Sequence, residues 1–151
     1  PVVEGWTLGG TLAYTRGQYK DAAGNWRELN AFRVSPLKAT VYSDWRFLDG
    51  YGVRLQALTV GGSDRAYDDA QSAAISPTIR ATPATKIQGY TVVDLIAHAP
   101  WLGGEVGFGV YNLANRDYKT VYGQQAEATY GAISSLPAAG RTFGLSYSVA
   151  Y

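Results

Sequence analysis

Six segments of the chain alternate large apolar side chains with small or polar ones at a spacing of two residues. This period places the two sets on opposite faces of an extended strand. In the last segment the apolar set is Phe143, Leu145, Tyr147, Val149 and Tyr151. In the other five segments the apolar sets are Trp6, Leu8, Leu12 and Tyr14; Ala39, Val41, Trp45 and Phe47; Val53, Leu55 and Ala57; Val93, Leu95 and Ala97; and Val106, Phe108 and Val110. The pattern predicts six β-strands and almost no helix.

The connections between these segments differ in length in a regular way. Short turns are expected at 48–51, around an Asp49-Gly50 pair, and at 102–104, whereas long polar loops cover about 19–37, 65–88 and 115–140. This alternation is typical of outer-membrane barrels, in which periplasmic turns are short and extracellular loops are long. The pattern therefore predicts part of an antiparallel transmembrane β-barrel, with its three long loops outside the cell.

A soluble β-sandwich or a lipocalin-like barrel would show the same alternation, so the nature of the two faces has to decide. The polar face is dominated by Gly, Ala, Ser and Thr, instead of the Lys and Glu of a solvated surface. Aromatic residues gather at strand ends beside the short turns, as in a headgroup belt: Trp6, Trp45, Phe47, Trp101 and Tyr151. We therefore expect the apolar face to contact lipid and the small-residue face to surround an occupied pore.

The composition narrows the possible chemistry. The 151 residues contain no Cys and no Met, which excludes disulfides and thiolate metal sites. Thirteen Lys and Arg against twelve Asp and Glu give a formal charge of +1, which disfavours nucleic acid as a partner. No stretch approaches the roughly 18 apolar residues of a spanning helix. Because the chain starts at Pro1 without a leader, and six antiparallel strands cannot close a barrel, we expect residues 1–151 to be part of a longer protein.

Three motifs follow one another along the second half of the chain: GYTVVDL at 89–95, NLANRDY at 112–118 and GRTFGLSYSVAY at 140–151. In this order they resemble the last strands of the TonB-dependent receptor family, and RVSPLKAT at 33–40 resembles an earlier strand entry. The resemblance implies a barrel of about 22 strands, of which these are the carboxy-terminal six, and a plug domain outside this chain. Most motif residues have a structural interpretation: Asn112 and Asn115 satisfy backbone groups at a strand end, and Gly89 and Gly140 allow the chain to turn.

A finer resemblance lies in NRDYKTVYGQQA at 115–126 and GRTFGL at 140–145, which are similar to the ferric aerobactin receptor subfamily. It implies an outer-membrane receptor that imports a ferric citrate-hydroxamate siderophore and is driven by TonB through the plug. It implies no cofactor, because iron arrives inside its chelate. A passive porin or a barrel adhesin remains the alternative, and a plug domain upstream would distinguish the receptor from both.

The last strand also resembles the signal that outer-membrane barrels present to their assembly machinery, in which the final residue is usually Phe. In this chain the signal comprises Phe143, Leu145, Tyr147, Val149 and Tyr151. The terminal Tyr151 is therefore a departure from the commonest form. The implied partners are the assembly machinery, membrane lipid and lipopolysaccharide, besides the siderophore and TonB.

Ferric citrate-hydroxamate complexes are anionic, so cationic donors and aromatic walls near the outer vestibule are the expected ligand-binding groups. The candidates are Lys38, Tyr42, Arg65, Arg80, Lys86, Tyr111, Arg116, Lys119, Tyr122, Gln124 and Gln125. For each residue alone, contact with solvent or lipopolysaccharide is the simpler interpretation. Arg16 lies at the same spacing of two residues as Leu12 and Tyr14, which places it on the apolar face. We therefore expect it to point outward toward lipid phosphate. A second set should face the pore near the short turns and contact the plug: Arg46, Arg54, Asp94 and His98.

One pair of residues could suggest an enzymatic function. His98 follows Asp94 by four residues on the same strand face, which supplies one ingredient of an acid-base pair. The expected position near the periplasmic turns is far from substrates in the outer leaflet, and a single His disfavours a directly bound metal. The sequence therefore predicts a binding and transport function without catalysis.

Overall fold

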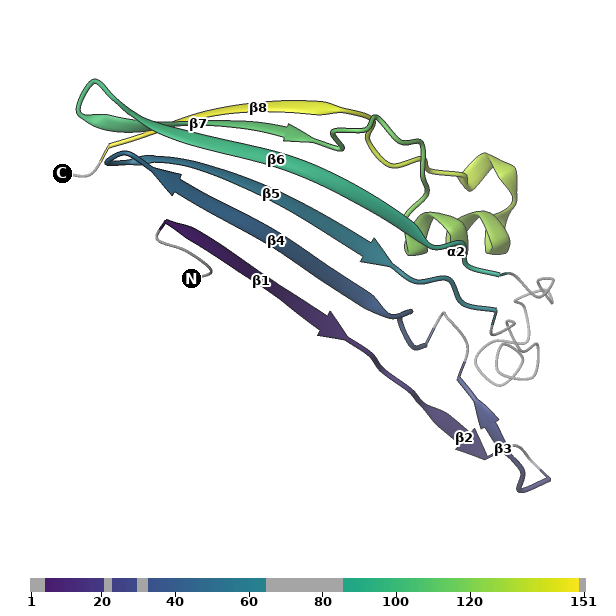
Figure 1. The fold of residues 1–151 in the computed structure, drawn as a ribbon. Helices are drawn as coiled ribbons and strands as arrows, with labels where there is room; N and C mark the ends of the chain where they lie inside the picture. Colours follow the sequence, from purple (N-terminus) through teal and green to yellow (C-terminus); the bar gives the residue numbers. More distant parts are fainter. Residues whose placement is uncertain (1–4, 21–22, 30–32, 65–85, 150–151) are drawn as a thin grey trace.

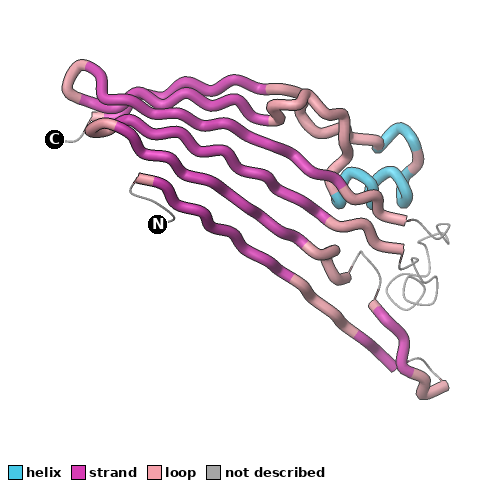
Figure 2. The backbone as a smooth tube through the Cα atoms, viewed as in Figure 1, coloured by secondary structure: helices cyan, strands magenta, loops and turns pink. Residues whose placement is uncertain are grey.

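The structure, a computed structural model, describes residues 5–20, 23–29, 33–64 and 86–149. Its main strands are β1 (Trp6–Ala13), β4 (Lys38–Phe47), β5 (Tyr51–Val60), β6 (Tyr90–Trp101), β7 (Gly104–Tyr111) and β8 (Thr142–Ser148). They form one open antiparallel sheet in the order β1-β4-β5-β6-β7-β8 (Figure 1). The sheet is a single curved layer (Figure 2). The prediction of six strands in an antiparallel arrangement is confirmed.

The register of the strands determines which side chains share a face, because directly paired residues of an antiparallel sheet point to the same side. Val41 pairs with Ala57, which in turn pairs with Val93. At the other side of the sheet, Phe108 pairs with Leu145. The apolar residues of neighbouring strands therefore form one continuous face, as the alternation predicts.

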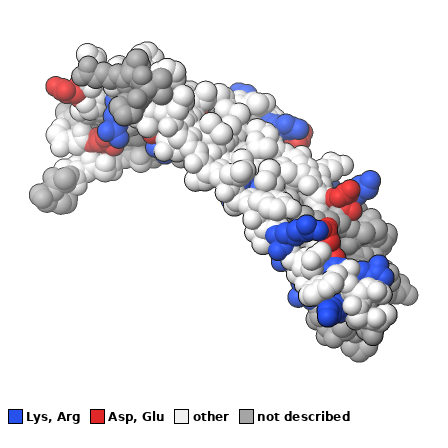
Figure 3. All heavy atoms as spheres, turned by 60° about the horizontal axis from the view of Figure 1, so that its bottom comes forward, with Lys and Arg blue, Asp and Glu red and all other residues white. Residues whose placement is uncertain are grey.

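This apolar face is broad and lacks cover from any other described element. Leu145 is 79% exposed, Leu12 is 71% exposed and Val41 is 60% exposed. An apolar surface of this extent needs an apolar environment. On the side of the molecule drawn in Figure 3, charged side chains gather toward the two ends and leave a largely uncharged band between them. Of the helices formed by the described residues, none has the length and hydropathy to cross a membrane.

The two short turns are found where the sequence places them. Strand β4 connects to β5 through 48–50, and β6 connects to β7 through 102–103. Leu102 and Gly103 have φ angles of 47° and 78°, which is the geometry of a two-residue hairpin turn that matches strand twist. Gly103 adopts this geometry without the steric cost that Leu102 carries. Both turns lie at one end of the sheet, opposite the long loops (Figure 1).

Aromatic rings cluster at the short-turn end, as expected for a headgroup belt. Trp45 and Phe47 have ring centroids 5.2 Å apart, and Phe47 stacks on Tyr51 at 6.2 Å. Trp101 meets Tyr147 edge to face at 5.9 Å. Trp6 starts β1 opposite Trp45, and its indole N–H donates to Ser43 Oγ at 2.7 Å. Tyr151, also predicted for this belt and for the assembly signal, lies outside the described residues.

The long loops contain more regular structure than the sequence predicts. The first holds a hairpin of β2 (Gln18–Lys20) and β3 (Trp26–Glu28), and the third holds helix α2 (Val121–Tyr130) and the 3-10 helix η1 (Ala132–Ser134). The expectation of almost no helix is therefore wrong for 115–140. Thr120 caps α2 by accepting a hydrogen bond from Gly123 N at 3.1 Å, and Gly131, at φ 84°, ends it. These local signals lie outside the alternation that identifies the strands.

Arg16 lies between β1 and the hairpin. Its guanidinium donates to the Glu28 carboxylate of β3, with an N···O distance of 2.5 Å. The ion pair therefore ties the end of the barrel strand to the hairpin. Contact of Arg16 with lipid phosphate stays a prediction.

Candidate functional site

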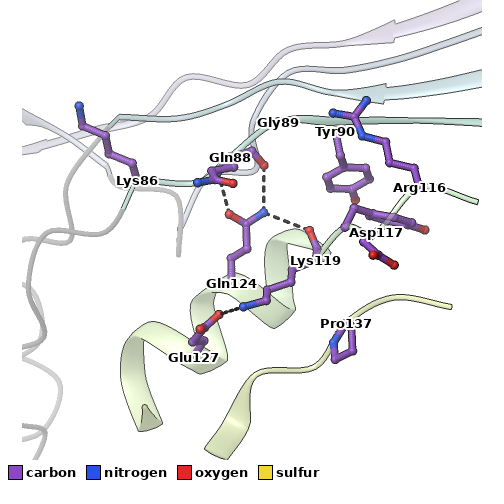
Figure 4. A pocket seen from close by; sticks show the side chains of 11 residues that line it. Lys86, Gln88, Gly89, Tyr90, Arg116, Asp117, Lys119, Gln124, Glu127 and Pro137 are labelled. Atoms are coloured by element: carbon purple, nitrogen blue, oxygen red, sulfur yellow. Dashed lines mark hydrogen bonds and ion pairs between the residues drawn. The ribbon is translucent and has the colours of Figure 1, made fainter. Parts of the chain in front are cut away.

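A groove of about 500 Å³ lies at the loop end of β6, between the segment that enters this strand and helix α2 (Figure 4). Four of the predicted ligand-binding residues line it: Lys86, Arg116, Lys119 and Gln124. Lys86 comes from the segment before β6, whereas the other three belong to the loop between β7 and β8. The groove is thus assembled from two segments far apart in the sequence, and we take it as the candidate site.

The entry of β6 forms one wall of the groove. A Cβ on Gly89 would lie 2.8 Å from both Gly62 N and Val60 O, so the close approach of these backbones requires glycine. Gly89 therefore has a structural role, but through this close approach: its φ angle is not positive, so a turn that only glycine allows is not the reason. The next residue, Tyr90, packs its ring against Tyr118 with the centroids 4.6 Å apart. The two tyrosines provide the aromatic surface of the groove.

Gln124 holds helix α2 against this wall. Its Oε1 accepts a hydrogen bond from Gln88 N at 2.7 Å, and its Nε2 donates to Gln88 O at 2.9 Å (Figure 4). The same Nε2 donates to Lys119 O at 3.0 Å. Three hydrogen bonds therefore join the side-chain amide of Gln124 to the backbone of the groove walls. A ligand contact by Gln124 stays a prediction, whereas its part in building the groove is visible.

The charges of the groove are mixed. Lys119 Nζ lies 2.5 Å from Glu127 Oε2 on helix α2 (Figure 4). The hydrogen bond from Lys119 lowers the pKa of Glu127 below the usual glutamate value, so the Glu127 carboxylate is ionised at neutral pH. Lys86 and Arg116 add two positive charges to the lining, against the carboxylate of Asp117. A lining with cationic donors in excess suits a ligand that carries anionic oxygens.

Five further candidates for ligand binding lie within the described residues and do not line this groove. Lys38 and Tyr42 lie on the pore face of β4, and Tyr111 ends β7 with its ring over Gly109. Tyr122 and Gln125 belong to α2, where Tyr122 is 73% exposed. Arg65 and Arg80 lie outside the described residues. Ligand contact by these seven residues stays a prediction.

Near the short turns, the pore face carries a cluster of charged side chains. Arg54 donates from Nε and Nη2 to the two carboxylate oxygens of Asp44, both at 2.6 Å, and its guanidinium lies 4.7 Å from the Tyr42 ring centroid. Arg46 and His98 line a cavity of about 220 Å³ together with this pair. The predicted pore-facing position of Arg46, Arg54 and His98 agrees with the register. Their contact with a plug stays a prediction.

Asp94 is engaged away from His98. Its Oδ2 accepts from Gln56 Nε2 at 3.0 Å, and its Oδ1 accepts from Asn112 N at 2.9 Å. The carboxylate therefore connects strand β5 to the residue that follows β7, across β6. Within the part of the chain that the structure describes, no group of three or more His, Asp or Glu residues is arranged to hold a metal ion.

Asn112 and Asn115 satisfy backbone groups at the end of β7, as the sequence suggests. Asn112 Nδ2 donates to Arg116 O at 2.9 Å and to Ala139 O at 3.2 Å, while its Oδ1 accepts from Arg116 N at 2.9 Å. Asn115 Oδ1 accepts from Arg141 N at 2.8 Å. The two side chains thus close the base of the loop that carries α2.

Sequence reasoning missed several groove residues: Gln88, Tyr90, Asp117, Tyr118, Glu127 and Pro137. Tyr90 and Tyr118 belong to the GYTVVDL and NLANRDY motifs, but nothing in these motifs indicates that the two rings are in contact. Glu127 reaches Lys119 because the chain becomes helical after Thr120. The helix cap at Thr120 was the local signal that could have suggested this pair.

Comparison with known proteins places these features in context. No protein-family model matches the chain. The ferric aerobactin receptors of Escherichia coli and Klebsiella pneumoniae are each 34% identical to it over 136 residues, which is 85% of this chain and 16% of the relative. The chain therefore spans about a sixth of the length of these curated relatives.

Two solved structures share the fold. The copper transporter OprC superposes with a TM-score of 0.68 at 20% identity, over 93% of this chain and 20% of that protein. The ferric-catecholate import receptor Fiu of E. coli K12, in a closed form, superposes with a TM-score of 0.61 at 21% identity, over 95% of this chain and 18% of that protein. At these identities the likeness concerns the fold.

The open sheet thus corresponds to a piece of the wall of an outer-membrane β-barrel, with one apolar face and one face of small and polar residues. This chain belongs to the TonB-dependent outer-membrane receptor family, as a segment of the barrel related to the ferric aerobactin receptors.

Proposed function

We propose that this chain is part of a receptor that imports a ferric siderophore across the outer membrane, with citrate-hydroxamate chelates of the aerobactin type as its substrates. The observation that carries the proposal is the 34% identity to two ferric aerobactin receptors over 85% of the chain. At the level of fold, the likeness to a ferric-catecholate import receptor supports iron-chelate transport. The iron is substrate, held by its chelator, and the protein needs no cofactor of its own.

The groove at the outer rim supports this assignment on chemical grounds. A citrate-hydroxamate chelate presents carboxylate and hydroxamate oxygens, which accept hydrogen bonds from ammonium and guanidinium groups. Lys86 and Arg116 supply such donors, and Tyr90 and Tyr118 supply a flat apolar surface. The chelate would be bound and moved intact, so no catalytic group is required.

The other partners follow from family membership and belong to the same proposal. A plug domain would fill the pore and contact Arg46, Arg54, Asp94 and His98, and TonB would act on that plug. Lipid would cover the apolar face, lipopolysaccharide would surround the outer loops, and the barrel assembly machinery would recognise the last strand.

The proposal is tested first with the complete gene. A strain that lacks it should lose growth on ferric aerobactin as the single iron source, because no other route would supply this chelate. Complementation with the complete gene should restore growth, whereas ferric catecholates should support both strains equally. Equal use of ferric aerobactin by the deletion strain and its parent would contradict the proposal.

A matched pair of variants tests the groove. Arg116→Gln removes a charged donor from the lining, and we expect it to weaken binding of iron-labelled aerobactin by about tenfold or more, the usual effect of losing a hydrogen bond to a charged group. Arg141→Gln removes the same charge from an exposed position outside the groove and should leave binding unchanged. Equal losses in the two variants would indicate a general electrostatic effect instead of a groove contact.

A further inference from the structure

A chain of hydrogen bonds runs from the middle of the pore face to the candidate groove. It starts at Gln56 on β5, passes through the Asp94 carboxylate on β6, and reaches Asn112 just beyond β7. From there the Asn112 amide contacts Arg116, whose side chain lines the groove. We propose that Asp94 and Asn112 are positioning residues, which fix the groove-bearing loop of residues 113–141 and thereby set ligand affinity without contacting the ligand.

The position of Asp94 suits this task. Asp94 pairs directly with Gln56 in the β5–β6 register, so the two side chains lie next to each other on the pore face. Gln56 donates to one carboxylate oxygen at 3.0 Å, which leaves the other free to accept Asn112 N at 2.9 Å. A carboxylate that accepts two hydrogen bonds has a fixed orientation. The backbone leaving β7 is therefore held at a defined point above the pore face.

Asn112 transmits this position to both ends of the loop. Its side chain is buried, with 3% of the residue exposed, and its φ of 52° marks the place where the chain leaves the sheet. Its side-chain amide hydrogen-bonds to both the backbone N–H and the backbone C=O of Arg116, at the start of the loop. The same amide donates to Ala139 O at 3.2 Å, near the end of the loop. The backbone of the groove cation Arg116 is thus fixed on both sides by a single side chain.

The consequence for binding rests on the function proposed above. A loop that is already ordered pays less conformational entropy when the ligand binds, and its donors stay close to the productive geometry. Asp94 and Asn112 do not line the groove, so their effect on affinity would be exerted through Arg116 and the loop. Loss of the hydrogen bonds made by Asp94 or Asn112 should therefore weaken binding even though every groove side chain remains.

Two substitutions of Asp94 separate this role from a charge contact with a plug. Asp94→Asn keeps an oxygen that accepts from Asn112 N, and its new N–H can donate to Gln56 Oε1 once that amide has turned over. We expect Asp94→Asn to bind iron-labelled aerobactin within about threefold of the wild type. Asp94→Ala removes both acceptors and should weaken binding about tenfold or more. Equal weakening in both variants would overturn the proposal, because it would show that the charge matters and the hydrogen bonds do not.

Asn112→Gly provides the second variant. Glycine adopts a positive φ easily, so this change removes the hydrogen bonds of the Asn112 side chain without straining the backbone. It should weaken binding as much as Asp94→Ala does. Thr91→Val is the control, because Thr91 hydrogen-bonds to Thr59 at 3.0 Å on the same strand pair but on the apolar face. It should leave binding unchanged. Wild-type affinity in Asn112→Gly would overturn the proposal.

Hydrogen exchange of the loop keeps this test independent of the ligand. In outer membranes that contain the complete receptor, Asp94→Ala and Asn112→Gly should speed amide exchange within residues 113–141, whereas Asp94→Asn and Thr91→Val should not. If the variants show this pattern of exchange but the wild-type receptor binds no ferric aerobactin, the proposed function is wrong. The inference that Asp94 and Asn112 position the loop then still holds. If Asp94→Ala leaves loop exchange at the wild-type rate, the inference itself fails.

Discussion

The barrel wall and the outer loop of residues 113–141 are held together in different ways. Between β5 and β6 the register runs without interruption from the Gly52–His98 pair to the Val60–Tyr90 pair. Apart from helices α2 and η1, the loop has one isolated β-bridge, Lys119 to Pro137, and it is joined to the wall by side chains such as Asn112 and Gln124, while Thr120 caps α2. Repeated backbone pairs share the stability of the wall among many residues, whereas the loop concentrates it in a few. Single substitutions should therefore act differently in the two regions.

In the wall, the face of a residue should matter more than its identity. Leu145→Arg puts a charge on the apolar face of β8, where contact with lipid should cost about 2–4 kcal/mol of folding stability. Ser146→Arg, the next residue, points to the pore and should cost less than about 1 kcal/mol. Denaturant unfolding of the complete receptor in lipid vesicles measures both. A larger cost for Ser146→Arg would reverse the assignment of the two faces.

In the loop, loss of one cap should open one helix. Thr120→Ala removes the side-chain acceptor of Gly123 N, and an N-cap contributes about 1 kcal/mol to a helix. Amide exchange in the first turn of α2 should therefore become roughly fivefold faster, while exchange in β6 should stay unchanged. Thr120→Ser keeps the acceptor and should behave like the wild type. Faster exchange spread through the wall would show that the loop and the wall are one cooperative unit.

The smallest effect is expected from pH. The pKa of Glu127 is lowered in the folded loop, chiefly by the hydrogen bond from Lys119, so its stabilising contribution is present above the unfolded pKa. That contribution should disappear as the pH falls through the lower, folded pKa. Amide exchange across α2, corrected for its intrinsic rate, should then show reduced protection below about pH 4. Glu127→Gln should remove this pH dependence, and an unchanged dependence in that variant would assign it to another group.

The wall was predictable because its information is local and periodic. The alternation of Val41, Trp45 and Phe47 with Tyr42, Asp44 and Arg46 already separates the apolar face from the pore face. The short turns were predictable for the same reason, since Asp49-Gly50 is a local turn signal. Helix α2 was not predicted because the polar composition of this segment indicates a loop, although Thr120 and Gly131 mark the two ends of the helix.

The sequence by itself determined the six main strands, their two faces, the short turns and the family to which the chain belongs, because each of these depends on neighbouring residues. Only the tertiary structure decided that Gln124 binds the backbone of Gln88, 36 residues away, and that Asp94 holds Asn112. Those contacts depend on strand register and on the path of a loop, which bring together atoms from separate parts of the chain. A periodic pattern fixes the direction of a side chain, but its partner is chosen by the packing of the whole wall.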